Sequence, residues 1–455
     1  MFYGLTPSTT ICGFPVTPSC QQNPRPASRD ALERAQLERL RGLMGEVRAS
    51  NTFYRRKLSG AGGEGTPAAS LDAVLSGLPF TTKAELQEDQ ERHPPFGTNL
   101  TQPLERYSRV HQTSGSTASP LRWLDTPSSW DRLVDAWGEV YRGAGVVPAD
   151  RVFFAFSFGP FIGFWAGFES AARLGSLAIP GGGLTTAARL SAILDMGATV
   201  VVATPTYALH MAEAARAGGI DLAKSPVRTL IVAGEPGGSV PATKARIEAA
   251  WGARCFDHCG MTEVGPFGFE CMEAPGGLHA LESEFIVEVV DPATGKRASS
   301  AGGEARAEGE LVITNLCRAA SPVIRYRTGD LVRWSTRPCP CGRPWGRFEG
   351  GILTRIDDML FIRGNNLYPS AVEAIIRSFP DVGEYQAKAT RKGEMTSLEI
   401  QIEPGPGVLG GEALGDRVSA AVERAFLFRA AVKVVPPGSL PRYEMKGKRF
   451  TKEVT

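Results

Sequence analysis

The sequence lacks an excess of charge of either sign, a basic leader followed by an apolar core, and an apolar run long enough to span a membrane. It carries 50 Lys and Arg against 48 Asp and Glu, and no basic stripe with interleaved aromatics stands out, so nucleic acid is not an expected partner. The most membrane-like run, residues 152–168, stops at 17 residues and contains three glycines and Pro160, whereas a spanning helix needs about 20 apolar residues. We interpret this run as buried core and expect a cytoplasmic protein with no membrane contact.

The sequence also has few cysteines for its length. Eight cysteines in 455 residues, without a secretory leader, argue against a disulfide framework and favour free thiols or metal ligands. The length exceeds what one hydrophobic core usually serves, so more than one domain is expected.

The order of apolar and polar segments predicts an α/β protein. Residues 1–30 are expected to form a loosely held arm, followed by a polar helix over 28–50, and Thr81 or Thr82 can cap a later helix. From Arg151 onward, apolar runs alternate with helical patterns, which indicates parallel βαβ units. We therefore expect a large N-terminal domain over 1–356 built from βαβ sheets. It includes an antiparallel β subdomain over about 282–350, and a small α+β domain follows over 357–455.

A hydroxyl-rich stretch, HQTSGSTASPLRW at 111–123, is the first candidate for chemistry. Four hydroxyls flank one glycine and a proline closes the run, so hydroxyls and amide N–H groups can point into one concavity that suits an anion. The stretch lacks the lysine and spacing of the usual P-loop. Read alone, it is also compatible with a plain surface turn.

Six motifs occur in one order along the chain: TSGSTASP, AGEP, HCGMTEVGPFGFEC, YRTGD, TRIDDMLFIRGNNLYPSAVE and PRYEMKGKRF. In this order, and from about Phe53 to Arg449, the chain resembles the phenylacetate–coenzyme A ligase branch of the adenylate-forming enzymes. The resemblance implies an ATP-dependent aryl-CoA ligase. Such an enzyme joins an aryl acid such as phenylacetate, benzoate or 2-aminobenzoate to AMP, releases pyrophosphate, and passes the acyl group to coenzyme A.

The resemblance also implies which residues bind ATP and Mg²⁺. The nucleotide-binding residues would be Thr113, Ser114, Gly115, Ser116, Thr117, Gly234, Glu235, Pro236, Cys259, Asp330 and Arg355. Glu263 matches the carboxylate that holds Mg²⁺, a hard cation that prefers oxygen ligands, and Thr262 would touch the α-phosphate. The phosphate loop has Ala118-Ser119 where relatives usually have Gly-Lys, so its positive charge must come from elsewhere.

The same resemblance places a hinge at Asp357, where the small domain would turn between the two half-reactions. Lys446 matches the C-terminal lysine that neutralises charge during adenylation. Lys448, which follows Gly447, is the competing assignment, and a solvated basic tail is the simplest alternative.

Aromatic side chains crowd residues 156–165, next to where the family places its acyl pocket. Phe156 and Phe161 are the best candidates for contact with an aryl acid, while the other rings are expected to pack in the core. The remaining substrate candidates are His258, Gly260 and Pro266. His258 would meet a carboxylate or ring substituent, or serve a purely structural role.

Cys271, His279, Cys339 and Cys341 make a Cys₃His set typical of a closed structural zinc site. Unligated thiols are the alternative. If zinc binds, it would fasten the antiparallel strands to the loop that carries Glu263.

Two alternative functions stay open at the level of sequence. One is an adenylating enzyme that delivers the acid to a carrier-protein thiol or an amine. The other is a non-catalytic module that binds a nucleotide or an aryl acid. Relatives suggest a homodimer.

Overall fold

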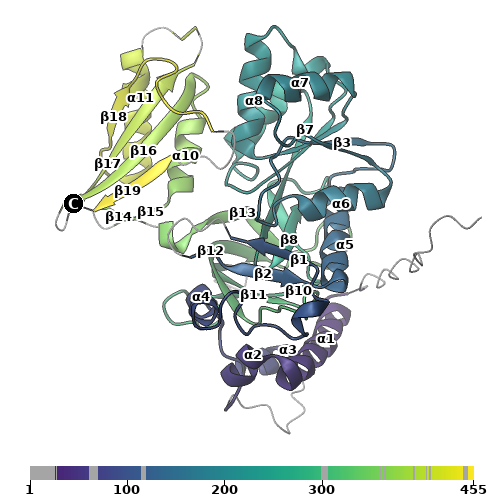
Figure 1. Ribbon diagram of the computed structural model, residues 1–455. Helices are drawn as coiled ribbons and strands as arrows, with labels where there is room; N and C mark the ends of the chain where they lie inside the picture. Colours follow the sequence, from purple (N-terminus) through teal and green to yellow (C-terminus); the bar gives the residue numbers. More distant parts are fainter. Residues whose placement is uncertain are drawn as a thin grey trace, which may run out of the picture.

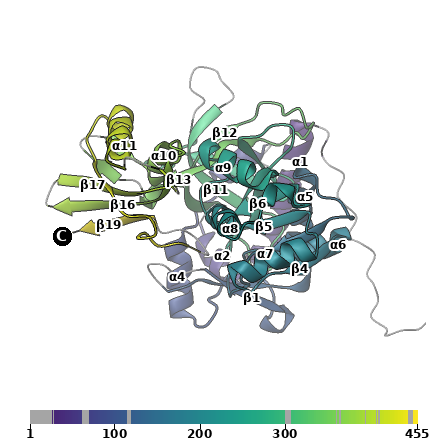
Figure 2. The same ribbon diagram turned by 90° about the horizontal axis from the view of Figure 1, so that it is seen from above.

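The computed structural model describes residues 26, 28–60, 70–113, 119–298, 306–358, 360–362, 365–392, 395–405, 407–408, 411–443 and 449–454. A large body carries a small C-terminal domain beside it, as Figure 1 shows from the front and Figure 2 from above. Each part has its own hydrophobic core. Every helix within these described ranges is too short or too polar to span a lipid bilayer.

One mixed sheet of 11 strands runs through the body. Its parallel half contains, in spatial order, β4 (Leu177–Pro180), β3 (Arg151–Phe154), β5 (Val200–Ala203), β6 (Thr229–Ala233) and β7 (Arg254–Met261). Its antiparallel half continues with β8 (Gly265–Glu270), β9 (Gly277–Ala280), β13 (Arg347–Arg355), β12 (Tyr326–Ser335), β11 (Arg306–Asn315) and β10 (Phe285–Val290). The antiparallel pairing therefore already begins at β8, ahead of residue 282, and it continues the sheet of the parallel strands.

Helices cover both faces of the parallel half. One face carries α5 (Pro127–Gly143) and α6 (Trp165–Leu174), and the other carries α7 (Thr186–Asp195), α8 (Pro205–Ala217) and α9 (Pro241–Trp251). Val200 and Val202 pack into the first core cluster, while Val201 and Ala203 pack into the second. Because successive strand residues face opposite sides, a strand buried on both faces must be apolar throughout, as these runs are.

The N-terminal segment wraps the antiparallel half. It contains α1 (Arg29–Ser50), α2 (Thr52–Lys57), α3 (Leu71–Ser76), α4 (Lys83–Arg92), the short helix η1 (Leu104–Arg106), and the hairpin of β1 (Arg109–Gln112) and β2 (Arg122–Asp125). Thr82 caps α4 in a capping box with Glu85, so the second of the two predicted caps is confirmed. The predicted helix over 28–50 is also confirmed, with Ser28 as its N-cap.

The small domain follows the short helix η4 (Ile356–Asp358). It contains β14 (Leu360–Ile362), β15 (Asn365–Leu367), α10 (Pro369–Arg377), β16 (Val382–Lys392), β17 (Met395–Pro404), α11 (Gly411–Phe426), β18 (Ala431–Val434) and β19 (Phe450–Val454). Its four-stranded sheet has the order β18-β17-β16-β19. The sequence predicted a small α+β domain here, but its pattern did not indicate β19. This strand is only five residues long and two of them are charged, and its parallel pairing with β16 makes it a strand.

Candidate active site

The turn between β7 and β8 carries Thr262 and Glu263, both buried. Three side chains from the neighbouring strands and their connections hold this turn. Arg318 Nη1 donates to the carbonyl of Thr262 (2.6 Å), Asn315 Nδ2 donates to the carbonyl of Val264 (2.6 Å), and Tyr326 Oη donates to Glu263 Oε1 (3.4 Å). The predicted magnesium carboxylate is therefore fixed from the antiparallel half of the sheet.

Arg318 is itself held by a buried ion pair. Its Nε and Nη2 atoms donate to the two carboxylate oxygens of Asp125 at 2.7 and 2.5 Å, and both side chains are completely buried. Asp125 is the last residue of β2, so this pair joins the β1–β2 hairpin to the Thr262 turn. His111 Nδ1 lies 3.9 Å from Asp125 Oδ2. Burial is the main cause that lowers the pKa of His111 to about 4, and the nearby positive charge of Arg318 lowers it further. His111 is thus neutral at pH 7.

The β1–β2 hairpin carries the predicted phosphate loop. Thr113 closes the hairpin, since its N–H donates to the carbonyl of Leu121 (2.9 Å) and its hydroxyl accepts from the N–H of Leu121 (3.1 Å). Ser114, Gly115, Ser116 and Thr117 lie outside the described residues, so their predicted contacts stay predictions. Gln112 N–H donates to the carbonyl of Pro160 at 2.7 Å, which joins this hairpin to the predicted acyl pocket.

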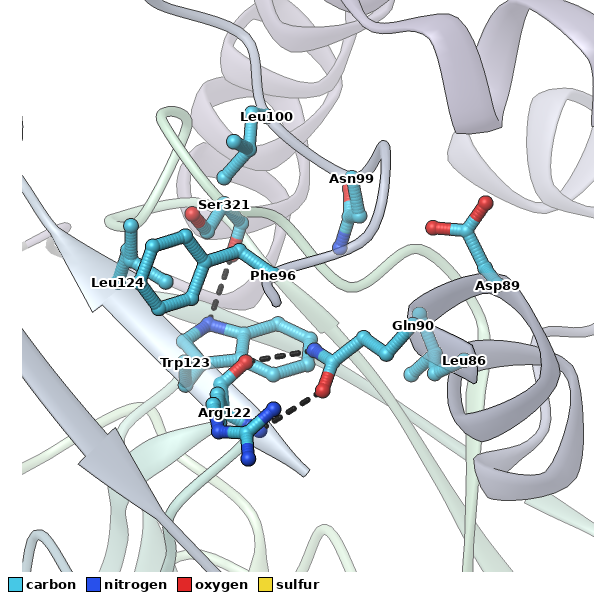
Figure 3. Close-up of a pocket in the computed structure, with 10 residues that line it drawn as sticks. All are labelled: Leu86, Asp89, Gln90, Phe96, Asn99, Leu100, Arg122, Trp123, Leu124 and Ser321. Atoms are coloured by element: carbon cyan, nitrogen blue, oxygen red, sulfur yellow. Dashed lines mark hydrogen bonds between the residues drawn. The ribbon is translucent and has the colours of Figure 1, made fainter. Parts of the chain in front are cut away.

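Helix α4 packs against the β1–β2 hairpin. Gln87 Nε2 donates to the carbonyl of Ser119 (2.9 Å), and Gln90 exchanges hydrogen bonds with the backbone of Arg122, as Figure 3 shows beside the small pocket between α4 and β2. At the start of α4, Lys83 Nζ lies 4.0 Å from Glu263 Oε1. The sequence pattern assigned Lys83 no role, because only the docking of α4 brings this lysine to the turn.

The AGEP turn follows β6. Gly234 has φ +97°, a backbone conformation that favours glycine, and Glu235 Oε1 accepts from the N–H of Thr206 (2.8 Å) at the start of α8. Pro236 is exposed at the same turn. The three predicted adenine-turn residues thus lie at the carboxyl end of a parallel strand, where ligands of such sheets bind.

Asp257, near the end of β7, is a buried acid that the sequence did not single out. Its carboxylate accepts hydrogen bonds from Ser239 Oγ and from the N–H of His258 (3.0 Å), and a Cβ on Gly238 would lie 2.5 Å from its Oδ1 atom. Burial raises its pKa to about 7, and the nearby Glu270 adds to the rise, while the bond from Ser239 opposes it. The only sequence signal was its place at the end of a predicted strand.

Of the predicted substrate residues around β7, His258 has a titratable side chain, whereas Gly260 and Pro266 do not. Burial lowers the pKa of His258 to about 4, so its ring is neutral and its Nδ1 proton is donated to the carbonyl of Gly268 (2.7 Å). This ring also packs on Trp137 at 4.3 Å. A neutral ring gives a carboxylate no charge to pair with. Gly260 and Pro266 are paired across the β7–β8 hairpin.

Cys259 lies at the outer end of β7. A Cβ on the facing Gly268 would lie 2.4 Å from Cys259 Sγ, so the thiol packs onto that strand. Burial is the main cause that raises the pKa of this thiol well above its usual range. The nearby negative charges of Asp257 and Asp330 raise it further. Cys259 is therefore a neutral thiol with little surface to stack on a base.

Asp330 and Arg355 face each other across β12 and β13. Arg355 Nη1 lies 3.2 Å from Asp330 Oδ1 and its Nη2 atom 3.9 Å from Asp357 Oδ2. Asp330 is buried, whereas Asp357 is exposed in η4, at the start of the small domain. Arg355 thus contacts both the predicted ribose carboxylate, Asp330, and the predicted hinge residue, Asp357.

Aromatic rings gather after β3. The ring of Phe156 lies 5.5 Å from that of Phe161 and 4.7 Å from that of Phe164, both edge to face. Phe158 packs instead on Trp165 at 4.6 Å. Phe161 is partly exposed, while Phe156 and Phe164 are buried, so Phe161 is the ring best able to meet a ligand.

The structure brings the four predicted metal ligands together. The candidate ligand atoms of Cys271, His279, Cys339 and Cys341 all lie within 4.8 Å of one another. Cys271 Sγ is 3.7 Å from Cys339 Sγ, and Cys341 Sγ is 3.3 Å from His279 Nε2. Two sulfurs each about 2.3 Å from a tetrahedral zinc lie about 3.8 Å apart, whereas a disulfide needs about 2 Å. The four side chains therefore fit a zinc ion.

Lys446 and Lys448 lie outside the described residues, so the choice between them stays open. The described site residues lie on the turns after β6 and β7, on the β1–β2 hairpin and on the β12–β13 pair. They include a buried glutamate with a nearby lysine, a buried aspartate paired with an arginine, and a cluster of aromatic rings. This combination can bind a nucleotide, a divalent cation and a flat apolar acid.

Comparisons with known proteins agree with this description. The model of the C-terminal domain of AMP-binding enzymes matches residues 364–453. A phenylacetate–coenzyme A ligase of Thermus thermophilus is 33% identical over 436 residues, which cover 91% of this chain and 95% of the relative.

Two crystal structures of a 2-hydroxyisobutyryl-CoA ligase resemble the chain to different degrees. In the postadenylation state with 2-HIB-AMP, the TM-score is 0.88 at 31% identity, with 94% of this chain and 91% of the other covered. In the thioesterification state with 2-HIB-AMP and CoA, the TM-score is 0.70 at 32% identity with the same coverage, 94% and 91%. The arrangement of the present chain is thus closer to that of the postadenylation state.

Proposed function

The chain belongs to the phenylacetate–coenzyme A ligase family and is an AMP-forming acid–thiol ligase, and we propose that the acid it activates is an aryl carboxylic acid. In the first step an oxygen of the carboxylate attacks the α-phosphorus of ATP, and the bond from that phosphorus to pyrophosphate breaks. In the second step the thiol sulfur of coenzyme A loses its proton and attacks the acyl carbon, and AMP leaves. Phenylacetate, benzoate and 2-aminobenzoate are the acids we expect to be accepted.

The observation that carries the aryl assignment is the ring cluster beside the phosphate hairpin. Phe161 is partly exposed against Phe156, and the Gln112–Pro160 hydrogen bond holds this segment next to the hairpin. Edge-to-face contacts with a flat ring add about 0.5–1.5 kcal/mol each beyond burial. The neutral ring of His258 supports the same assignment, because it suits an apolar or weakly polar ring better than a second carboxylate.

In this proposal the first half-reaction depends on positioning and on charge stabilisation. Glu263 binds Mg²⁺, and Thr262 contacts the α-phosphate. Asp330 and Arg355 bind the ribose, Gly234, Glu235 and Pro236 line the adenine, and Thr113 with residues 114–117 holds the outer phosphates. The ion itself supplies positive charge at the phosphate oxygens when bound.

Lys83 accounts for part of the charge that the phosphate loop lacks. The loop has Ala118-Ser119 in place of Gly-Lys, and Lys83 is a basic side chain already within 4.0 Å of Glu263. Once Mg²⁺ occupies Glu263, the long, half-exposed lysine is free to reach the outer phosphates. Lys446 is the second proposed cation, acting at the reacting phosphate.

We also propose a structural zinc ion held by Cys271, His279, Cys339 and Cys341. Burial lowers the pKa of His279 to about 4, so the ring is neutral, as metal binding requires. Unligated thiols are the alternative, and a direct assay of the metal distinguishes the two.

The test of the main proposal is acid-dependent release of pyrophosphate across a panel of aryl acids, with and without coenzyme A. We expect release with at least one aryl acid and an acyl-CoA product. Glu263→Gln should lower the release by roughly 100-fold or more, because it removes a charge that acts in the transition state. Lys446→Ala should lose adenylation but still form thioester from supplied adenylate.

Other outcomes would contradict the proposal. Pyrophosphate without thioester would favour a carrier thiol or an amine as the acceptor. No release with any acid would favour a binding module. Equal loss of both half-reactions in Lys446→Ala would move the role to Lys448 or to folding.

A further inference from the structure

Arg449 lies where the small domain meets the body, and only 7% of it is exposed. Inside its own domain, Nε and Nη2 donate to the two carboxylate oxygens of Glu384 at 2.7 and 2.8 Å. Its remaining terminal nitrogen, Nη1, donates to Thr206 Oγ1 at 2.7 Å. Thr206 belongs to α8 of the body, so one guanidinium joins the two domains.

Thr206 also contacts the adenine turn. Its backbone N–H donates to Glu235 Oε1 at 2.8 Å, while its hydroxyl accepts from Arg449. A single residue at the N-terminus of α8 therefore connects the predicted nucleotide turn to the small domain.

Other polar contacts also join the two domains, among them a hydrogen bond from Ser370 Oγ of α10 to the carbonyl of Leu353 beside the predicted hinge. Arg246 Nη1 donates to the carbonyl of Val382 at 3.2 Å, and Arg442 Nε lies 3.8 Å from Glu213 Oε2, with both side chains of that pair partly exposed. Exposed ion pairs contribute little because water screens them, whereas a buried hydrogen bond from a charged donor contributes more. Among these links, the Arg449–Thr206 contact joins two buried side chains through a charged donor.

This contact belongs to one arrangement of the two domains. The present arrangement is closer to the postadenylation structure than to the thioesterification structure of the same 2-hydroxyisobutyryl-CoA ligase. Any substantial rotation of the small domain about Asp357 must break a 2.7 Å bond between side chains of different domains.

We propose that Arg449 and Thr206 form an interdomain catch that holds the small domain against α8 of the body for adenylation and opens for thioester formation. Both are positioning residues that touch neither substrate nor the reacting atoms. Their link through Glu235 makes closure of the small domain sensitive to an occupied adenine turn. The inference rests on the proposed function, since it assigns the catch to one of its two half-reactions.

The test is Thr206→Val, which removes the acceptor while keeping the shape and the backbone bond to Glu235. Acid-dependent pyrophosphate release in a single turnover should fall by about 10-fold, the loss expected for one charged hydrogen bond. Thioester formation from supplied aryl adenylate and coenzyme A should stay within about twofold of the wild type, because the bond is absent in that step. Arg449→Lys, which keeps the charge but not the fork, should show the same selective loss.

Two controls separate the catch from folding and from surface charge. Thr243→Val is matched to the test variant, because Thr243 is buried in α9 and its hydroxyl has no hydrogen-bond partner. Neither half-reaction should change in it. Glu213→Gln should lower adenylation by less than about twofold, as for an exposed pair. The thermal midpoint of each variant is measured alongside.

Equal loss of both half-reactions in Thr206→Val, or no loss in either, would overturn the catch while leaving the proposed function intact. Absence of pyrophosphate release in the wild type would instead contradict the proposed function itself. A loss confined to thioester formation would show that the contact acts in the other state and would also overturn the proposal.

Discussion

The charged residues of the site are held by partners inside and outside the recognised motifs. Glu263 is fixed by Tyr326 and approached by Lys83, and the carbonyl beside it is held by the buried Arg318–Asp125 pair. A buried ion pair of this kind contributes little net stability, but removing one partner leaves an uncompensated charge and is strongly destabilising. At the scale of single residues, these contacts therefore fix the geometry of Glu263, the proposed magnesium carboxylate.

The buried carboxyl of Asp257 gives a prediction about how stability depends on pH. Its pKa in the folded protein is about 7, whereas an unfolded aspartate titrates near 3.9. Between about pH 3.9 and pH 7, Asp257 is protonated in the folded protein but ionised in the unfolded chain. The free energy of unfolding therefore falls as pH rises through this range, and the stability contributed by the protonated carboxyl is lost above about pH 7. Asp257→Asn carries no such charge, and its stability relative to the wild type should rise by on the order of 2 kcal/mol from pH 5 to pH 8.

Urea unfolding at several pH values measures this difference. Asp416→Asn, on the exposed face of α11, is the matched control. A difference between Asp257→Asn and the wild type that does not change with pH would show that the carboxyl is not protonated in the fold.

At the scale of elements, the site is assembled from two hairpins and one helix. The β7–β8 hairpin presents Glu263, the β1–β2 hairpin carries Thr113 of the predicted phosphate loop, and α4 lies against the β1–β2 hairpin through Gln87 and Gln90. Trp123 Nε1 adds a bond to the carbonyl of Ser321 (3.0 Å), shown in Figure 3, which ties β2 to the segment before β12. The start of α4 therefore decides where Lys83 lies.

The cap of α4 should accordingly affect both stability and nucleotide binding. Thr82 Oγ1 accepts from the N–H of Glu85 (3.3 Å), and Glu85 Oε2 accepts from the N–H of Thr82 (2.8 Å). Thr82→Ala should lower the free energy of unfolding by about 1 kcal/mol. Because the first turn of α4 carries Lys83, loosening that turn should also raise the KM for MgATP about 3-fold. Ser70→Ala, which removes the cap of α3, should lower stability similarly without changing this KM. Unchanged KM in Thr82→Ala would separate Lys83 from nucleotide binding.

At the scale of the whole molecule, one continuous sheet joins the parallel and antiparallel halves, and the small domain lies beside the helices of the parallel half. The Cys₃His cluster fastens three parts of the antiparallel half, because Cys271 follows β8, His279 lies on β9, and Cys339 and Cys341 lie between β12 and β13. The homodimer and the cytoplasmic location expected from the sequence stay predictions.

The cluster gives the prediction at this scale. Purified protein should contain about one zinc per chain, and Cys339→Ser with Cys341→Ser should lose the metal and on the order of 3 kcal/mol of stability. Elemental analysis and thermal unfolding measure the two effects. Cys317→Ala, a buried cysteine outside the cluster, should keep its zinc. Metal-free protein with unchanged stability in the double variant would favour unligated thiols.

The sequence by itself determined most of the elements and the family. Apolar runs such as residues 200–203 predicted the strands of parallel βαβ units, and six ordered motifs indicated the ligase family, which the relatives confirm. It also named the four members of the Cys₃His set, although they lie up to 70 residues apart, because thiol and imidazole groups at such spacings indicate metal chemistry. Local pattern and residue chemistry were sufficient for these predictions.

Only the tertiary structure decided which side chains meet across long distances. Lys83 reaches Glu263, Arg318 pairs with Asp125, and Arg449 reaches Thr206 because helices and strands far apart in sequence dock on one sheet. None of these pairs has a local signature, since an ion pair between distant elements leaves no periodicity in the chain. The strand β19 follows the same rule, because its pairing with β16 determines its conformation. The sequence therefore carried the chemistry of the site, and the packing of the elements supplied the partners that hold it.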